Sequence, residues 1–320
     1  MTLLDAARQG DERAFGELVA PHRRELEAYC YRMLGSAPDA EDVVQETLLA
    51  AWRGLAGFEG RSSIRTWLYR IASRAVLRRS EQRARLLSQE RHPPLDQWED
   101  LGAAVEDAGW VGPWIGGDPE DIASRRETLG LAYVAALQHL PPNQRAVLIL
   151  RDVLAFSAVE TARLLDTSVA SVTSALQRAR DTLDRRRPIA TAGVPGEHRA
   201  VVDRFVTAME ARDLDALVSV LAEDVQFTMP PLPAWFDGRE AVAGFFEHRV
   251  FETPWRQVRM ADVSGCPALL GYQEQHGVLR ASALQVLHVD AEQKISWIAS
   301  FLDPALLARL PHPEILPRDR

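Results

Sequence analysis

The residues best suited to chemistry in this sequence are the arginines and aromatic residues of one short stretch. Residues 61–85 contain eight arginines and a single acidic residue. Arg70, Arg74 and Arg78 follow one another at intervals of four, so a helix would place them along one face, with Trp67 at its edge. Because like charges at this spacing repel one another, the pattern indicates that an anion binds there.

Arginine and aromatic side chains together suit single-stranded DNA. Guanidinium groups hold phosphates, and unpaired bases stack on aromatic rings. A basic face that merely contacts solvent is the alternative, and the stretch alone does not separate the two. The net charge of the whole chain, −8, is no objection, because the field at a surface depends on the local arrangement of charges.

A second candidate site lies in residues 157–180, which have the layout of a helix–turn–helix. The pattern predicts a short helix, a tight turn at Asp166–Ser168 and a second helix that opens with Ser and Thr. The apolar positions that would pack the two helices together are Ala162, Leu164 or Leu165, Val172 and Leu176. The residues that would face base edges and phosphates are Ser171, Thr173, Ser174, Gln177 and Arg178. An ordinary helical hairpin is the alternative.

The elements that must position these residues begin with two helical regions. Apolar periodicity predicts helices throughout residues 1–85 and again in residues 125–187. One helix of the first region is expected to be capped by Asp39. Between the two regions, residues 86–121 hold nine acidic residues, one arginine and several prolines. This composition predicts a long acidic linker, whose tryptophans indicate that parts of it dock on another surface.

A third region follows a Pro/Gly hinge. Its pattern is helix-like over residues 198–224 and again over 238–251. The period then changes to two, which predicts four strands at residues 255–263, 267–275, 278–290 and 294–302. This region is therefore expected to be α+β, unlike the helical regions before it.

Composition and motifs exclude several classes of protein. Cys30 and Cys266 give neither a disulfide framework nor the spacing of a zinc site. Phosphate-binding loops, nucleophile elbows and metal motifs are absent, so no cofactor and no metal are expected. The first residues lack the pattern of a signal peptide, and no run of about 18 apolar residues occurs. We therefore expect a cytoplasmic protein that does not bind a membrane.

The first 187 residues resemble a sigma factor of the extracytoplasmic-function (ECF) group within the sigma-70 family. The stretch DAEDVVQETLLAAWRGL is similar to the region 2 helix that docks on the clamp of RNA polymerase. FEGRSSIRTWLYRIASRAVLRR is similar to the adjoining helix, which captures the melted minus-ten promoter element. LPPNQRAVLILRDVLAFSAVETARLLDTSVASVTSALQRARDTL is similar to region 4, which reads the double-stranded minus-thirty-five element. Thr173, Ala175 and Gln177 depart from this resemblance, because family members commonly carry basic residues there.

The resemblance implies partners and site residues, and no catalysis. The partners would be the clamp and flap regions of core RNA polymerase, and promoter DNA in double-stranded and melted form. The polymerase-docking residues would be Asp39, Glu41, Asp42, Val44, Gln45, Glu46, Leu49 and Trp52. The minus-ten contacts would be Arg61, Ser62, Trp67, Arg70 and Arg74. The acidic linker would thread toward the polymerase active centre and imitate nucleic acid, with a simple tether as the alternative.

The stretch EDVQFTMPPLPAWFDGREAVAGFF, residues 223–246, is the most characteristic part of the third region. Through it, residues 198–310 resemble the SnoaL-like fold, a cone-shaped α+β domain in which helices and a curved sheet enclose a cavity. The resemblance implies an attached regulatory domain. The residues expected around the cavity are Phe227, Met229, Trp235, Asp262, Tyr272 and His288, with Phe246, His276 and Trp297 as further candidates. Relatives of the fold include cyclases and isomerases that use Asp and His for proton transfer. No pair of such residues has a diagnostic spacing here, so a structural role is expected for both histidines.

The sequence thus predicts a multidomain chain of two all-α domains followed by one α+β domain. The predicted boundaries are region 2 at 1–86, the linker at 87–124, region 4 at 125–188, the hinge at 189–197, the SnoaL-like domain at 198–310 and a tail at 311–320. The expected function is a sigma factor regulated in cis by its C-terminal domain. Two alternatives stay open: a bifunctional sigma factor whose C-terminal domain binds or converts a small molecule, and a helix–turn–helix repressor that works without polymerase.

Overall fold

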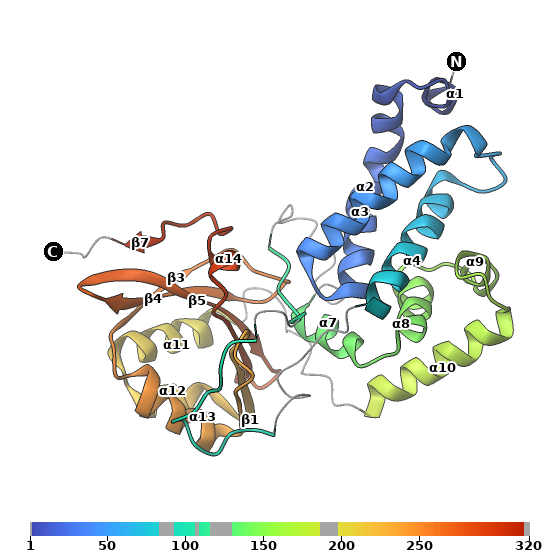
Figure 1. Ribbon diagram of the computed structural model, residues 1–320. Coiled ribbons are helices and arrows are strands. Elements are labelled where there is room, and N and C mark those ends of the chain that lie inside the picture. The colour runs from blue at the N-terminus through green and yellow to red at the C-terminus, as the bar shows by residue number, and fades with distance from the viewer. Residues whose placement is uncertain (1, 83–92, 106–108, 116–129, 186–197, 317–320) are drawn as a thin grey trace. The chain divides into compact units, whose positions relative to one another are not determined.

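The computed structural model describes residues 2–82, 93–105, 109–115, 130–185 and 198–316 (Figure 1). The chain forms two compact units. The first contains residues 1–85 and 134–186, and the second contains residues 86–133 and 187–320. In the described part of the chain, no helix has the length and apolar character needed to cross a membrane.

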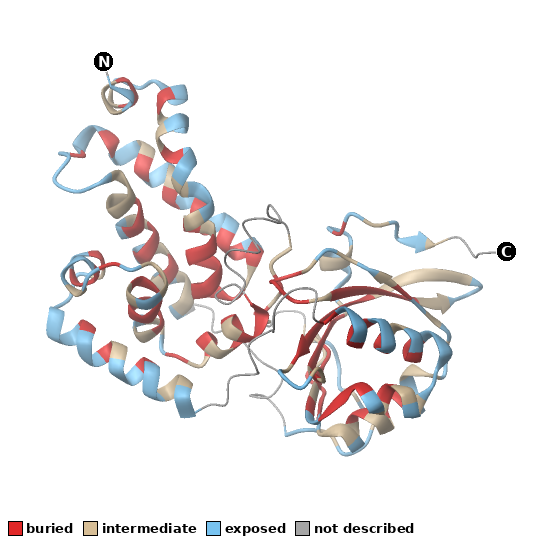
Figure 2. Ribbon diagram, turned by 180° about the vertical axis from the view of Figure 1, so that it is seen from behind, coloured by how far each residue is buried: buried red, intermediate tan, exposed pale blue. Residues whose placement is uncertain are grey.

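The first unit opens with a bundle of helices. Its elements are α1 (Leu3–Arg8), α2 (Glu12–Leu34), α3 (Ala37–Gly54), the 3-10 turn η1 (Leu55–Gly57) and α4 (Ile64–Gln82). α2, α3 and α4 pack against one another, and their facing sides are buried (Figure 2). The N-cap of α3 is Ser36, whose Oγ accepts a hydrogen bond from the Asp39 amide at 3.3 Å. The prediction that Asp39 caps this helix is therefore wrong; Asp39 occupies the first turn, where the helix dipole favours a carboxylate.

The second half of this unit contains the helix–turn–helix. Its elements are α7 (Leu131–Gln138), α8 (Pro142–Leu148), the π-helical turn η2 (Ile149–Val153), α9 (Ala158–Leu164) and α10 (Val169–Arg185). Ser157 and Glu160 form a capping box that starts α9. Asp166 has a φ of 54° in the tight turn after α9. Val147, Ala162, Val172 and Ala175 form the core between α8, α9 and α10, which confirms the predicted packing.

A buried arginine ties the two halves of the first unit together. Arg145, on α8, donates hydrogen bonds to the carbonyl oxygens of Met33, Gln138 (3.1 Å) and Leu140 (2.9 Å). The Gln138 amide nitrogen donates to the Arg32 carbonyl at 3.2 Å. Arg32 and Met33 lie in the last turn of α2, whose carbonyl groups need donors from outside the helix. The C-terminal end of α2 is therefore satisfied by side chains of α7 and α8.

The second unit is a curved sheet with helices on one face. Its elements are α11 (Arg199–Ala211), α12 (Leu214–Val220), β1 (Leu221–Thr228), β2 (Trp235–Asp237), α13 (Arg239–Phe245), the π-helical turn η3 (Phe246–Val250), β3 (Trp255–Arg259), β4 (Ala268–Gln275), β5 (Val278–Val289), β6 (Ile295–Phe301), α14 (Pro304–Leu307) and β7 (Ile315–Leu316). The strand order is β2-β1-β6-β5-β4-β3, with β7 paired to β5. β1 and β6 are parallel, and the other pairs are antiparallel. α11, α12 and α13 cover one face (Figure 1) and share a core with the strands.

The start of this unit differs from the expected helix over 198–224. Arg212 adopts a left-handed conformation with a φ of 53°, and this ends α11. The Asp213 carboxylate then accepts a hydrogen bond from the Ala216 amide and starts α12. Leu221 already belongs to β1. The apolar residues of 221–225 therefore pack from a strand, which periodicity alone does not distinguish from a continuing helix.

The described parts of the acidic linker lie on the second unit. The Leu95 amide donates to the Trp235 carbonyl at 2.9 Å, and the Val105 amide donates to the Pro231 carbonyl at 3.0 Å. Between these two bonds the Trp98 ring stacks on His248, with centroids 4.1 Å apart. We call residues 93–105 the strap. Trp98, one of the tryptophans that marked this linker as unusual in the sequence, is thus a packing residue.

Candidate functional site

The arginines of α4 form two groups: a braced group, paired with carboxylates of the chain, and an open group, without such an ion pair in the described structure. Arg78 pairs with Glu46 at 3.1 Å, and Arg79 pairs with Asp39 at 3.0 Å. Arg70 and Arg74 are exposed and make no ion pair with any residue that the structure describes. The open pair lies at i and i+4 on one face, the spacing that holds neighbouring phosphates.

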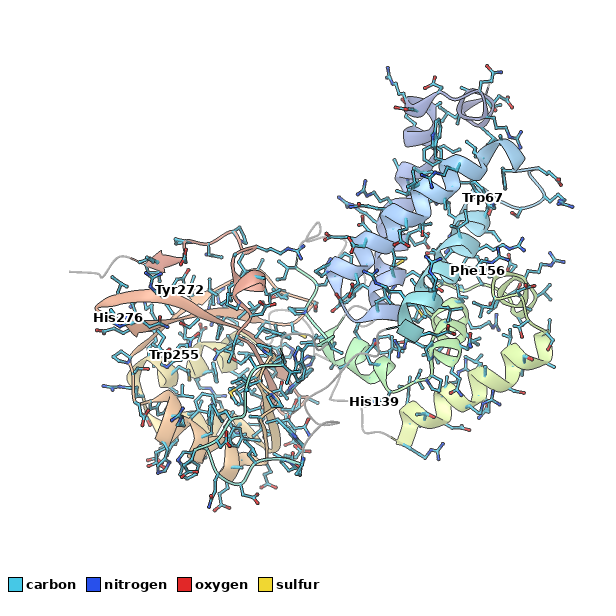
Figure 3. All side chains as sticks on the ribbon, in the orientation of Figure 1. Trp67, His139, Phe156, Trp255, Tyr272 and His276 are labelled. Carbon is cyan, nitrogen blue, oxygen red and sulfur yellow. The ribbon has the colours of Figure 1, made fainter. Side chains whose placement is uncertain are left out.

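Arg65 belongs to the braced group and links three elements. Its guanidinium makes two hydrogen bonds to the Glu25 carboxylate of α2, one of them 3.0 Å from Nε to Oε2. It also lies 4.5 Å from the ring centre of Phe156, which precedes Ser157, the N-cap of α9, and is labelled in Figure 3. The hydrogen bonds with Glu25 raise the pKa of Arg65. Arg65 therefore fixes the position of α4 relative to its neighbours.

Trp67 and its neighbours lie at the N-terminal end of α4. The Trp67 ring packs on Phe58, with centroids 4.9 Å apart, and is half-buried. Arg61 pairs with Glu59 at 2.7 Å at an exposed position, and Ser62 is exposed. Trp67 thus holds the segment that precedes α4, and only its outer edge is available to a partner.

The predicted docking helix, α3, presents one exposed face. Its exposed residues are Glu41, Asp42, Gln45, Glu46 and Leu49. Leu49 is 50% exposed among these polar residues, and its side chain could pack on a protein partner. Val44, predicted on this surface, is 1% exposed. It lies on the opposite face because of the helical period, and it packs in the core of the free protein.

Two other predicted docking residues are also engaged within the chain. Asp39 is buried and bonded to Arg79, and the half-buried Trp52 packs its ring 5.1 Å from that of Phe15. They support the docking face from behind.

The recognition helix, α10, carries an open face with little charge. Ser171, Thr173, Ser174, Gln177 and Arg178 are all exposed. The Gln177 amide donates to Asp181 at 2.8 Å, so part of its hydrogen-bonding capacity is already used. Arg180 is bound by both oxygens of Asp152 at 2.9 and 2.7 Å. Besides the exposed Arg178, the face of α10 thus offers neutral donors and acceptors to base edges.

Comparison with known proteins places this geometry in a family. Models of three families match the chain: Sigma-70 region 2 at residues 18–86, Sigma-70 region 4 at 131–183 and a SnoaL-like domain at 202–269. The chain is 38% identical over 322 residues to the ECF RNA polymerase sigma factor SigG of Mycobacterium tuberculosis, across 97% of this chain and 86% of that protein. The chain belongs to the ECF sigma factors.

Two further relatives agree with this assignment. The ECF RNA polymerase sigma-E factor of Escherichia coli K12 is 30% identical over 184 residues, which cover 58% of this chain and 92% of that protein. The crystal structure of the M. tuberculosis ECF sigma factor SigJ matches with a TM-score of 0.61 at 25% identity, over 90% of this chain and 96% of that one. This ECF sigma factor thus consists of helical sigma regions and a C-terminal SnoaL-like domain, as the sequence predicted, and it acts in transcription initiation.

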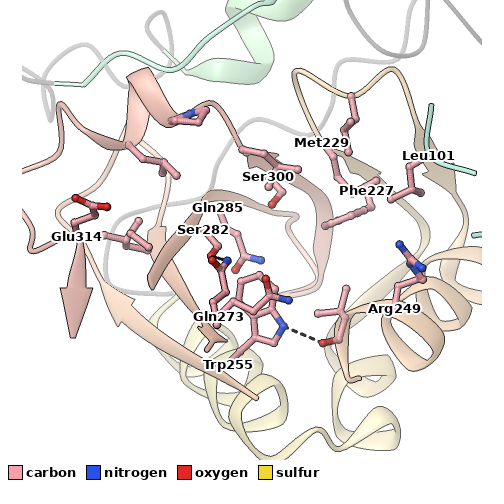
Figure 4. Close-up of a pocket in the computed structure, with 18 of the residues that line it drawn as sticks. Leu101, Phe227, Met229, Arg249, Trp255, Gln273, Ser282, Gln285, Ser300 and Glu314 are labelled. Atoms are coloured by element: carbon pink, nitrogen blue, oxygen red, sulfur yellow. Dashed lines mark hydrogen bonds between the residues drawn. The ribbon is translucent and has the colours of Figure 1, made fainter. Parts of the chain in front are cut away.

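The C-terminal domain contains a cavity of about 810 Å³ between the sheet and the helices (Figure 4). Phe227 and Met229 line it, as predicted, together with Phe245 and Phe246. Uncharged polar side chains cover the sheet side of the cavity: Gln273, Gln275, Ser282, Gln285 and Ser300. Among the described lining residues, the titratable side chains are Arg249, His312 and Glu314, and none of these is buried.

The other predicted cavity residues do not line this pocket. His288 lies on β5 three residues beyond Gln285, and side chains alternate along a strand, so it faces away. Its ring stacks on Trp297 and lies 3.5 Å from the Cys266 sulfur. Tyr272 is buried, which raises the pKa of its phenol, and its hydroxyl donates to the Pro313 carbonyl at 2.8 Å.

Trp235, Asp262 and His276 also lie outside the pocket lining. Trp235 is on β2, where its carbonyl receives the strap. Asp262 lies in the β3–β4 connection, and His276 forms the exposed hairpin turn between β4 and β5 with a φ of 52°. No group of three or more potential metal ligands is found among the residues that the structure describes.

The sequence did not predict most of the pocket lining, and three of the missed residues matter most. Gln285 and Ser300 face each other across β5 and β6, and Leu101 enters the lining from the strap. The period-two pattern of β5 was a usable signal for Gln285, because it places Gln285 and His288 on opposite faces. Leu101 carried no such signal, since nothing local shows where a linker docks.

Proposed function

We propose that this sigma factor divides its contacts among three helices. The exposed face of α3, with Leu49 among carboxylates, binds core polymerase. Arg70 and Arg74 of α4 hold the phosphates of the melted minus-ten strand, and the outward face of α10 reads the minus-thirty-five element in the major groove. The observation that supports this division most directly is that Arg70 and Arg74 stay open while the other described arginines of α4 are braced by carboxylates. The protein would act in the cytoplasm, with RNA polymerase.

We further propose that the C-terminal domain inhibits transcription in cis by retaining the linker. The support is the strap itself, which is bonded at Leu95 and Val105 and anchored by Trp98. A linker held on this domain cannot at the same time follow a path into polymerase, so the two states compete.

Run-off transcription with purified core polymerase tests both proposals. Gly102 has a φ of +74°, and a Cβ built there would lie 3.0 Å from Pro233. Gly102→Val should therefore release the strap and raise transcript yield several-fold. Gly112→Ala is the matched control, since its Cβ meets nothing within 4 Å. Unchanged yield from Gly102→Val, with hydrogen exchange showing a released strap, would refute inhibition in cis. No transcript from any promoter, including that of its own gene, would refute the assignment of the three helices.

A further inference from the structure

The pocket of the C-terminal domain has an apolar body and one unsatisfied polar group. Gln285 is 3% exposed, and its Oε1 has no hydrogen-bond partner in the described structure. It lies at the centre of the pocket, directly across the strand pair from Ser300 (Figure 4). A buried carbonyl oxygen without a donor is costly, so a bound molecule that offers a donor would relieve that cost.

The rest of the lining restricts what this molecule can be. Phe227, Phe245 and Phe246 form an aromatic wall, with Phe227 and Phe245 centroids 5.2 Å apart. The charged lining residues Arg249 and Glu314 are exposed, and Glu314 pairs with Arg280 at 3.1 Å. The buried part of the pocket thus offers no counter-charge, and an ionised ligand group there would remain uncompensated.

We propose that this pocket binds an uncharged, ring-containing apolar molecule whose hydroxyl group donates a hydrogen bond to Gln285. The aromatic wall takes the ring system, and Gln285 with Ser300 selects for the hydroxyl. A volume of about 810 Å³ accommodates several fused rings.

The strap supplies one wall of this binding site. Leu101 lines the pocket between the two backbone hydrogen bonds that hold residues 93–105. A ligand that packs on Leu101 stabilises the docked strap, so ligand binding and strap docking are coupled and each favours the other. The meaning of this coupling for transcription rests on the inhibition in cis proposed above, whereas ligand binding itself does not.

Three matched fluorescent probes test the binding site on the full-length protein at pH 7. They are 1-hydroxypyrene, pyrene and pyrene-1-carboxylate, which share one ring system. We expect one 1-hydroxypyrene to bind per chain, about tenfold more tightly than pyrene, a ratio that corresponds to one net hydrogen bond. Pyrene-1-carboxylate should bind most weakly. Equal affinity for all three, or no binding to the folded protein, would overturn the proposal.

Gln285→Met tests the selecting residue, because it keeps the length of the side chain and removes the amide. The variant should bind pyrene at least as well as the original protein and lose the tenfold preference for 1-hydroxypyrene. Gln275→Met is the matched control: this glutamine also lines the pocket, but it is exposed and its amide is bonded to Ser282 at 3.3 Å. A preference that survives Gln285→Met would overturn the assignment of Gln285.

Hydrogen exchange of the Leu95 and Val105 amides tests the coupling without polymerase. Saturating 1-hydroxypyrene should slow both amides several-fold in the original protein and have less effect in Leu101→Ala. Unchanged exchange at full probe occupancy would refute the coupling and leave the binding site intact. Because transcription is not involved, these outcomes stay distinct from a failure of the proposed inhibition.

Discussion

The two helices assigned to DNA, α4 and α10, present opposite kinds of surface. α4 carries a dense row of arginines, of which Arg65, Arg78 and Arg79 are paired with carboxylates of α2 and α3. α10 presents hydroxyl and amide groups, and its Arg180 is bound by Asp152. In both helices, some of the arginines form ion pairs with carboxylates of the same chain.

This difference suits two distinct contributions of the proposed promoter contacts, affinity and sequence discrimination. Phosphate contacts of free arginines give affinity that falls steeply with salt, whereas neutral hydrogen bonds to base edges give sequence discrimination with little salt dependence. The local charge of α4 would therefore suit the proposed contact with the phosphates of the separated strand. The face of α10, with hydroxyl and amide groups beside the exposed Arg178, would suit duplex DNA, whose major groove presents a code of donors and acceptors.

The largest effect is expected from removing the open arginines of α4. Arg70→Ala with Arg74→Ala should reduce run-off transcription on the order of 100-fold, because two charged hydrogen bonds to phosphate are lost. We also expect a weaker salt dependence of the binding of the sigma factor, with core polymerase, to promoter DNA. The slope of the logarithm of that binding constant against the logarithm of the salt concentration should become shallower by about 1.4, at roughly 0.7 per phosphate of a single strand. Core polymerase binding, measured by gel filtration, should stay unchanged.

Arg78→Ala is the control for this pair, because Arg78 lies on the same helix and is paired with Glu46. It should change transcription by less than about twofold, as expected for an exposed ion pair. An equal loss in Arg78→Ala and in the double variant would show that total charge, and not the open pair, decides strand capture.

A smaller and sequence-dependent effect is expected from α10. Gln177→Ala should lower transcription about tenfold on a promoter with its native minus-thirty-five element, in line with the discrimination of one base contact. On a promoter with a scrambled element the variant and the original protein should be equally weak. Arg180→Ala, which removes the partner of Asp152, serves as the control, and a uniform loss on both promoters would contradict base readout by Gln177.

The smallest effect is expected from the cap that positions the helix–turn–helix. Ser157→Ala should lower the free energy of unfolding by about 1 kcal/mol at pH 7. Hydrogen bonds from Ser157 lower the pKa of Glu160, so this contribution is present above the usual pKa of a glutamate and is lost as the pH falls below it. The free energy of unfolding should be measured with urea at pH 7 and at pH 3.5. The difference in this free energy between the variant and the original protein should be smaller at pH 3.5.

Most of the fold could be predicted from the sequence, but only part of the candidate site. Helical periodicity placed α3, α4 and α10, because each has one buried and one exposed face. Val44 was predicted on the docking surface from the family motif. Its helical spacing, in contrast, assigns it to the buried face. The burial of Val44 depends on the neighbouring helices, which the motif did not show.

The pocket was less predictable because its lining comes from distant segments. Phe227 and Met229 could be named since they end β1 within a characteristic stretch. His288 was named for its chemistry, although the alternation of β5 turns it to the opposite face from Gln285. Leu101 reaches the pocket only because the strap docks on this domain. The strap precedes β1 by more than a hundred residues in the sequence, so no local pattern indicates this contact.

The buried Arg145 has a consequence for how the first unit must open. Its hydrogen bonds to Met33 and Leu140 make the last turn of α2 and the start of α8 fold as one cooperative block. Any conformation that moves α7 and α8, with the helix–turn–helix, away from α2 breaks the hydrogen bonds from Arg145 to Met33 and from Gln138 to Arg32, while Arg145 keeps its bonds to Gln138 and Leu140. A partner that binds only the separated conformation would therefore bind with an apparent affinity reduced by the fraction of molecules already open.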